Sequence, residues 1–233
     1  MQINNLSIRK NTPHDVVKYT FSTSDPEYQE ALNKAKQLAN KVNPHAPDGT
    51  IRKPEKIFAV NFAGCLAEIA CINYFNGYFR QKNAFHLRAH STNFNPILDD
   101  QQIDIMVANS IKQISSTVEV RSSFSYAQSD INVYNQYFSL VGYYSSPNKP
   151  METPKDFYVT VIFRFDESYM PEKIKNGENI TLHIAAGASK DLLIADGEWD
   201  NLQNGTAQYR VIKPIINAWS VNKLCDKIID HLK

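Results

Sequence analysis

The sequence predicts a mixed α/β (α+β) protein in which a central mixed β-sheet is flanked by helices. Two observations lead to this fold class. Residues 102–107 and 117–123 each alternate apolar and polar side chains, the pattern of strands with one apolar face. Residues 24–43 and 54–76 repeat apolar side chains at helical spacing, and no regular alternation of strand and helix follows them.

Length and composition are those of a globular protein. The 233 residues permit one large domain with a sizeable core, and the net charge of +1 does not indicate non-specific polyanion binding, although a local basic groove remains possible. The chain has an odd number of cysteines: Cys65, Cys71 and Cys225. This count predicts reduced, buried thiols in a cytoplasmic protein. No apolar run approaches the roughly 20 residues of a membrane span, so we expect no membrane association.

Two helices are predicted in the first third of the chain. The first begins near Ser24, a favourable N-cap with Glu27 three residues later, and ends before Pro44. The second covers residues 54–76, is apolar nearly all round, and has Gly77 near its C-terminus.

A single carboxylate, Glu68, lies in the middle of this apolar second helix. A buried carboxylate is costly unless it is paired or bound to a cation. Two interpretations are open at this point. Glu68 either forms a structural ion pair or lies on an exposed stripe, or it has a functional role.

Several more strands and a final helix are predicted. The β-branched and aromatic run at residues 156–165 is the strongest strand signal and indicates a strand covered on both faces. Ser220 is a favourable N-cap for an amphipathic helix that reaches the C-terminal end. The remaining predicted strands are residues 16–21, part of 78–90, 137–144, 180–185 and 208–212.

Three further motifs contain ligand-type residues without the spacing of a known site. His86 and His90 have no third zinc ligand, and the turn Gly187–Lys190 lacks the spacing of a nucleotide phosphate loop. The acidic residues of segment 195–205, Asp196, Glu198 and Asp200, lack the order of a calcium loop, so a solvated loop is expected there. We expect ordinary structural roles for all of them.

The two alternating strands are the most informative stretch. If they pair, one surface can carry Asp104, Glu119 and Arg121 together. Two carboxylates and a cation on adjacent strands can hold a divalent metal and polarise a phosphate. The alternative is a cross-strand ion pair between Asp104 and Arg121 on the polar face of an ordinary hairpin.

This arrangement resembles the PD-(D/E)xK nuclease superfamily, the fold of many restriction endonucleases and DNA-repair nucleases. The resemblance rests on a Glu-bearing helix, a strand-borne Asp and a Glu-x-Arg on the next strand, over roughly residues 57–123 and the strand at 156–165. It implies a restriction-endonuclease-like core. We therefore expect residues 1–233 to form one such domain, with a helical portion at about 24–76 and a catalytic core at about 57–165.

The resemblance also implies roles for individual residues. Asp104 and Glu119 would bind Mg²⁺ together with the backbone carbonyl of Val120, and Glu68 would complete the catalytic site. Arg121 stands where the family has Lys, and Ile103 stands where it often has Pro.

Arginine stays protonated, so Arg121 cannot act as a base, but it can bind a phosphate oxygen. Either Arg121 stabilises charge, or Lys112 supplies the amine, or the site is inactive.

The implied function is a Mg²⁺-dependent DNA endonuclease of the type II restriction class that hydrolyses phosphodiester bonds at a specific sequence of double-stranded DNA. Cleavage of both strands at a symmetric site calls for a homodimer. The alternatives are a catalytically inactive nuclease-fold protein that binds DNA or regulates, and an unrelated α/β protein that binds a small ligand or a partner. The residues expected to contact DNA are Arg52, Lys53, Arg80, Arg88, Ser122, Ser123 and Tyr126, with Lys82 and Ser125 as further candidates.

Overall fold

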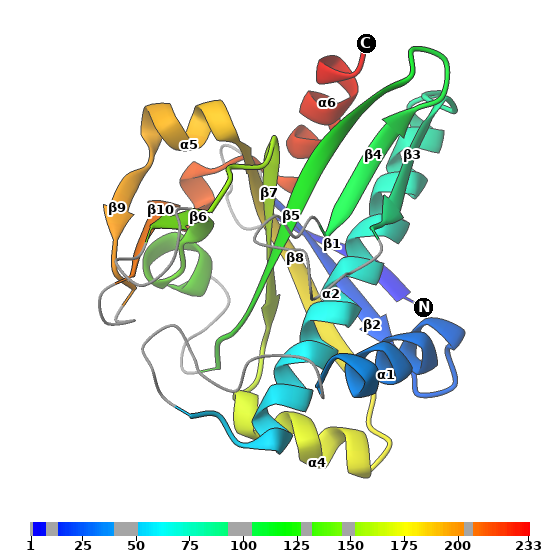
Figure 1. The fold of residues 1–233 in the computed structure, drawn as a ribbon, viewed down its shortest axis with the longest axis vertical. Coiled ribbons are helices and arrows are strands. Elements are labelled where there is room, and N and C mark those ends of the chain that lie inside the picture. The colour runs from blue at the N-terminus through cyan, green and yellow to red at the C-terminus, as the bar shows by residue number, and fades with distance from the viewer. Residues whose placement is uncertain are drawn as a thin grey trace.

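A computed structural model describes residues 2–7, 14–39, 51–92, 104–126, 132–145, 152–202 and 207–233, without the side chains of 2–7. A seven-stranded mixed sheet has helices on one face and a small three-stranded sheet on the other (Figure 1). The predicted mixed α/β fold class is confirmed.

The large sheet contains strands from both ends of the chain. Strands β5 and β7 are parallel, and every other neighbouring pair is antiparallel. The predicted hairpin is present in its described part, where β4 and β5 pair with Ile105 opposite Val118; residues 102 and 103 of the predicted first strand lie outside the described residues. In their order across the sheet the strands are β1 (Gln2–Ser7), β2 (Asp15–Phe21), β8 (Ile180–Ser189), β7 (Phe157–Phe163), β5 (Ile114–Phe124), β4 (Ile105–Asn109) and β3 (Leu87–Ser91).

Three helices cover one face of this sheet: α1 (Pro26–Ala39), α2 (Pro54–Gln81) and α6 (Val221–His231). Helix α2 lies against the sheet and contacts both of the others. The rings of Tyr28 in α1 and Phe62 in α2 meet edge to face, 5.2 Å between centroids. The small side chains of Ala31 and Ala35 are fully buried. They let α1 pack closely on α2, and this close packing determines which α1 side chains reach the sheet.

The second face of the large sheet is covered by smaller elements. Every residue of β7 is buried, which confirms the prediction of a strand covered on both sides. The covering elements are a π-helix η1 (Val133–Tyr137), the strands β6 (Leu140–Ser145), β10 (Gln208–Ile212) and β9 (Glu198–Asp200), the helix α5 (Lys190–Asp196) and a 3-10 turn η3 (Ile215–Asn217). The turn η2 (Glu167–Tyr169) and helix α4 (Met170–Lys175) lie at one end.

Two boundaries in the first half differ from the prediction. Helix α1 begins at Pro26, so Asp25 rather than Ser24 precedes it. Helix α2 continues through Gly77 to Gln81, because the buried side chains of Tyr78 and Phe79 offset the roughly 1 kcal/mol that a helical glycine costs. The strand expected within 78–90 is therefore confined to β3.

The turn predicted at Gly187–Lys190 is wrong, because β8 runs on to Ser189. Gly187 lies under α6, where an added Cβ would come within 2.4 Å of Leu224 Cδ2. Among the acidic residues after β8, Glu198 and Asp200 bind Lys213 at 2.8 and 2.7 Å. They form an ion-pair cluster with it, and because residues 198–200 are strand β9, the prediction of a loop is wrong for them.

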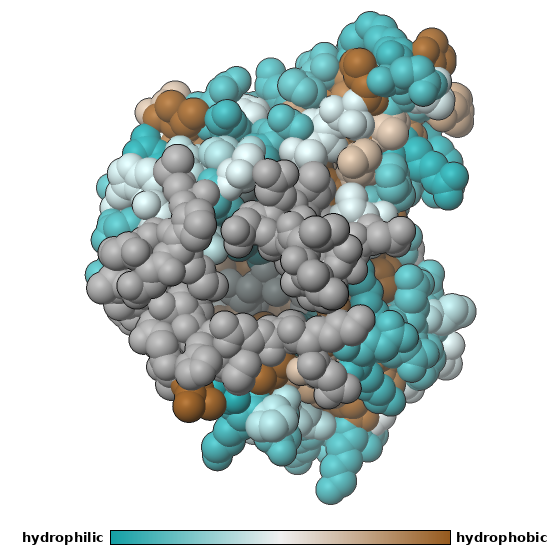
Figure 2. Space-filling model, viewed as in Figure 1, coloured by the Kyte–Doolittle hydropathy of each residue, from teal (hydrophilic) through white to brown (hydrophobic). Residues whose placement is uncertain are grey.

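Within the described ranges, α2 is long and apolar enough to cross a membrane by length and composition, which differs from the expected lack of such a run. More than half of its apolar stretch is buried in the protein. The coloured part of the surface in Figure 2 is mainly hydrophilic with small apolar patches. The three cysteines are buried and free, as predicted.

Candidate functional site

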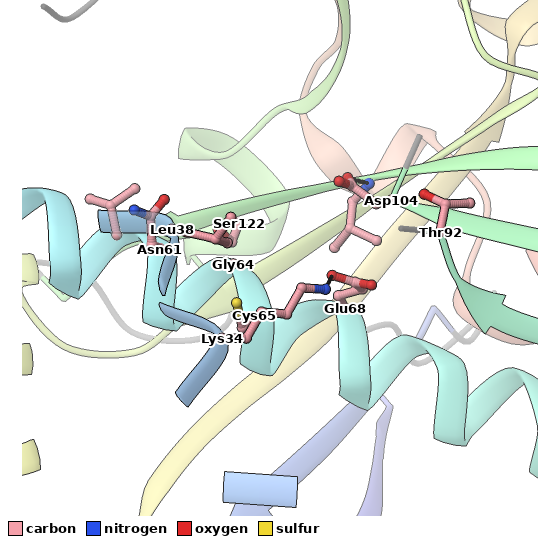
Figure 3. A pocket seen from close by; sticks show the side chains of 11 residues that line it. Lys34, Leu38, Asn61, Gly64, Cys65, Glu68, Thr92, Asp104 and Ser122 are labelled. Atoms are coloured by element: carbon pink, nitrogen blue, oxygen red, sulfur yellow. Dashed lines mark hydrogen bonds and ion pairs between the residues drawn. The ribbon is translucent and has the colours of Figure 1, made fainter. Parts of the chain in front are cut away.

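A cavity of about 210 Å³ lies between α1, α2 and the end of β5 (Figure 3). It brings together two of the predicted site carboxylates, Glu68 from α2 and Asp104 from the start of β4. Polar and apolar side chains share the rest of the lining. The lining residues are Lys34, Leu38, Val60, Asn61, Gly64, Cys65, Glu68, Thr92, Asp104, Val120 and Ser122.

Glu68 is buried and is paired with a lysine from the neighbouring helix. Lys34 Nζ lies 2.8 Å from Glu68 Oε2, and the side chains are 30% and 11% exposed. The same Nζ donates to Ser91 Oγ at 3.2 Å. The structural interpretation of Glu68, an ion pair with a basic residue, therefore holds, but the pair lines a cavity rather than the packed core.

Asp104 directly precedes Ile105, the first residue of β4. Regular alternation from Ile105, which faces the helices, would turn Asp104 toward the opposite face with Glu119. Instead, its carboxylate accepts the N–H of Val120 at 2.8 Å and borders the helix-side cavity. Asp104 thus lies close to the plane of the sheet, next to the part of β5 that extends beyond β4.

The backbone of Val120 presents a second oxygen on this side of β5. The N–H and C=O of one strand residue point toward the same neighbouring strand. Because the N–H of Val120 reaches Asp104, its carbonyl faces the same gap beside β5. The predicted roles of Asp104 and the Val120 carbonyl are thus compatible in geometry.

Burial raises the pKa of Asp104 to about 6. The N–H of Val120 and the charges of Arg121 and Lys34 oppose that rise, whereas the Glu68 carboxylate adds to it. A carboxylate that is costly to ionise gains from a nearby cation.

Glu119 and Arg121 occupy the other face of β5, toward the small sheet. They alternate with Val118 and Val120, and they do not line the cavity. Arg121 Nη2 contacts both carboxylate oxygens of Glu152 at 2.6 Å, and its Nη1 lies 3.4 Å from Glu119 Oε1. The expectation of one surface with Asp104, Glu119 and Arg121 holds for the last two only.

The Glu119 carboxyl is buried in this second cluster. Burial raises its pKa to about 8, and Asp104 and Glu152 add to the rise while Arg121 and Lys155 oppose it. Glu119 Oε2 and Arg121 Nε are buried without a hydrogen-bond partner. Within the described residues no three His, Cys, Asp or Glu side chains form a metal-binding group, so Glu119 does not join Asp104 and Glu68 in one.

The residues predicted to contact DNA are dispersed. Ser122 lines the cavity, and Ser123 lines an adjoining hollow. Arg88 is exposed on β3 and Tyr126 is exposed after β5, whereas Arg52 is only partly exposed. Lys53 and Arg80 stand at opposite ends of α2, roughly 40 Å apart at about 1.5 Å per residue.

Two charged residues were missed in the sequence, one that lines the cavity and one in the cluster on the other face of β5, and one alternative is wrong. Lys34 stands beside the apolar stripe of α1, which was a usable signal, whereas Glu152 lies in a segment without periodicity. Lys112 is in the turn at the far end of β4, roughly 17 Å or more from Asp104. It cannot supply the amine of this cavity.

No family model matches the chain, and no solved structure matches it. The chain is similar to "Uncharacterized protein MJECS01" of Methanocaldococcus jannaschii. The two are 27% identical over 233 aligned positions, covering 87% of this chain and 82% of that protein. The likeness extends over most of both chains, and the relative's name states no activity.

Proposed function

We propose that the protein is a Mg²⁺-dependent DNA endonuclease whose active site is the cavity bordered by Glu68 and Asp104. One observation carries the proposal: a helix carboxylate and a strand carboxylate, far apart in sequence, both face this cavity beside Val120. This is the order of elements that the nuclease resemblance implies. Glu119 stands behind Asp104 on the other face, outside this set.

The donor atoms are of the chemical type that a hard divalent cation prefers. Asp104 and Glu68 offer carboxylate oxygens and Val120 a carbonyl oxygen, and Mg²⁺ prefers oxygen ligands. These three residues would hold the ion. When bound, Mg²⁺ neutralises charge at the phosphate and acidifies water.

The protein's own groups would position the reactants. Hydrolysis forms a bond from a water oxygen to phosphorus and breaks one phosphorus–oxygen ester bond, with a proton passing to the departing oxygen. Asp104 is fixed by the Val120 N–H, so its carboxylate keeps one orientation while the phosphate enters. Ser122, at the mouth of the adjoining hollow, offers a hydroxyl donor to a phosphate oxygen.

The hollows beside the cavity suit an extended substrate. A second hollow of about 380 Å³ shares Val60 and Ser122 with the first. A third, of about 400 Å³, shares Glu167 with the second, and charges of both signs line it: Lys53 and Lys56 together with Glu55, Asp166 and Glu167. Hollows that share lining residues along the first half of α2 favour an extended substrate over a small metabolite. Cleavage of both strands of a duplex would still call for a homodimer.

Cleavage of supercoiled plasmid DNA in Mg²⁺ tests the proposal. We expect nicked and linear products with the wild type, none in EDTA, and a rate at least about 100-fold lower for Asp104→Asn, the size of loss typical for an electrostatic group. The Asn oxygen can still accept the Val120 N–H, so folding is preserved. Asp191→Asn, in α5, is the matched control. Wild-type protein that leaves the plasmid intact would contradict the proposal.

A second candidate is a nuclease-fold protein that binds DNA without cutting it. The observation that favours it is Arg121, whose guanidinium is engaged by Glu152 and Glu119 and does not reach the cavity. In that case gel retardation of a duplex would occur with no cleavage in Mg²⁺. Incubation with duplex DNA in Mg²⁺ therefore distinguishes the two candidate functions, because only the nuclease cleaves the DNA.

A further inference from the structure

We propose that Lys34 is the cation that contacts the substrate phosphate in this cavity, in place of the motif position that Arg121 occupies. The inference rests on the proposed function and assigns a substrate-contacting residue that the sequence pattern does not mark. Lys34 is identified by comparing which cationic side chains line the cavity and which do not.

The location of Lys34 follows from the register of α1. Ala31 and Ala35 are buried against the rest of the core, and Lys34 lies between them on the adjoining side of the helix. Lys34 and Leu38, one turn apart, both line the cavity. Figure 3 shows the Lys34 amine reaching toward Glu68, below Asp104. Among the described residues that line the cavity, Lys34 is the one cationic side chain.

Lys34 has the charge and the hydrogen-bonding capacity for this role. Burial lowers the pKa of Lys34, but the neighbouring Glu68 carboxylate raises it by more than burial lowers it. The net shift of the pKa is therefore upward, and the amine is an ammonium at neutral pH. An ammonium has three N–H donors. Two have acceptors in the structure, Glu68 Oε2 and Ser91 Oγ. A phosphate oxygen that enters the cavity can accept the third.

Arg121 cannot take this role without breaking its own contacts. Its Nη2 is held by both oxygens of Glu152, and it projects from the opposite face of β5. A guanidinium in a forked contact with a carboxylate is tightly held. The cation for the phosphate therefore comes from α1, across the cavity from β5.

The test compares Lys34→Met with Lys36→Met, an exposed lysine on the same helix. The first readout is the salt dependence of binding to a short DNA duplex in Ca²⁺. Loss of one phosphate contact lowers the slope of log K against log salt by about 0.9. We expect this change for Lys34→Met only. The second readout is single-turnover cleavage in Mg²⁺, where we expect Lys34→Met to be at least about 100-fold slower and Lys34→Arg to recover part of the loss.

The outcomes separate the two proposals. If the wild type does not cut but Lys34→Met lowers the salt slope, the nuclease assignment fails and the Lys34 contact stands. If the wild type cuts and Lys34→Met changes neither readout, the Lys34 inference is overturned and the nuclease stands. No binding of DNA by the wild type overturns both. Lys34→Gln replaces Lys34→Met if thermal unfolding shows that the latter does not fold.

Discussion

At the scale of single residues, β5 separates two groups of charges. Asp104, Glu68 and Lys34 gather on the helix side, and Glu119, Arg121 and Glu152 on the side of the small sheet. Asp104 directly precedes β4, close to the plane of the sheet, and the charges of both Lys34 and Arg121 oppose the rise in its pKa that burial causes. Ionisation in one group therefore affects the other through Asp104.

Glu119 makes a specific prediction about stability and pH. Its pKa is about 8 in the folded protein, against an ordinary value of 4.5, because the carboxyl is buried. Between those values the folded state keeps a proton that the unfolded state releases, so the free energy of unfolding falls as pH rises. The fall ends above about pH 8. Urea unfolding in EDTA should show a steeper decline for wild type than for Glu119→Gln.

The size of this effect is bounded by one proton, about 1.4 kcal/mol per pH unit at most. Glu119→Gln should match wild type near pH 4.5 and be more stable at pH 8, because Gln carries no charge to bury. Glu55→Gln, at an exposed carboxylate of α2, is the control and should follow wild type. Parallel curves for all three proteins would rule out a protonated Glu119.

At the scale of elements, α2 has two interior glycines that offer a matched pair. An added Cβ would meet no other atom within 4 Å at either Gly64 or Gly77, and only Gly64 lines the cavity. Alanine at either position should raise the free energy of unfolding by roughly 0.5–1 kcal/mol, because the unfolded chain loses the freedom of glycine. Urea unfolding measures this.

The same pair tests the cavity. Gly64→Leu should fill it and abolish Mg²⁺-dependent cleavage, whereas Gly77→Leu, on the same helix outside the cavity, should cleave like wild type. Both variants should remain folded by circular dichroism. Equal activity of the two leucine variants would mean that substrate does not enter between α1 and β5.

Periodicity predicted most elements but not every side chain at the site. The period of two placed β4 and β5 and put Glu119 and Arg121 on one face, as observed. It failed for Asp104, because a residue just outside a strand is free of that alternation. It contained nothing about Glu152, which has no periodic neighbours and is placed by Arg121 and the backbone of β6.

At the scale of the whole molecule, the last third of the chain belongs to the core rather than to an appendage. Strand β8 lies between β2 and β7 in the large sheet, and α6 packs with α2 on the helix face. The pairing of β2 with β8 joins residues such as Val17 and Ile184, which are distant in sequence. Local patterns do not specify such partners, so the strands were predictable and their order was not.

This architecture explains why the cavity is where it is. Strand β5 extends past the end of β4, and α1 and α2 cover the helix face beside that extension. Among the described residues, the cavity lies beside the part of β5 that extends past β4 and pairs with β7 along its other edge, and both carboxylates reach it from separate elements. The central claim is that Asp104 and Glu68 together hold one divalent cation there.

Electron paramagnetic resonance of Mn²⁺ tests that claim most directly. Mn²⁺ shares the preference of Mg²⁺ for oxygen ligands, and the signal of unbound Mn²⁺ decreases as the ion binds to the protein. We predict one site in the wild type, and affinity at least about 10-fold weaker, a difference of about 1.4 kcal/mol, in both Asp104→Asn and Glu68→Gln. Asp191→Asn should bind like wild type. Undiminished Mn²⁺ binding in the two cavity variants would contradict the account.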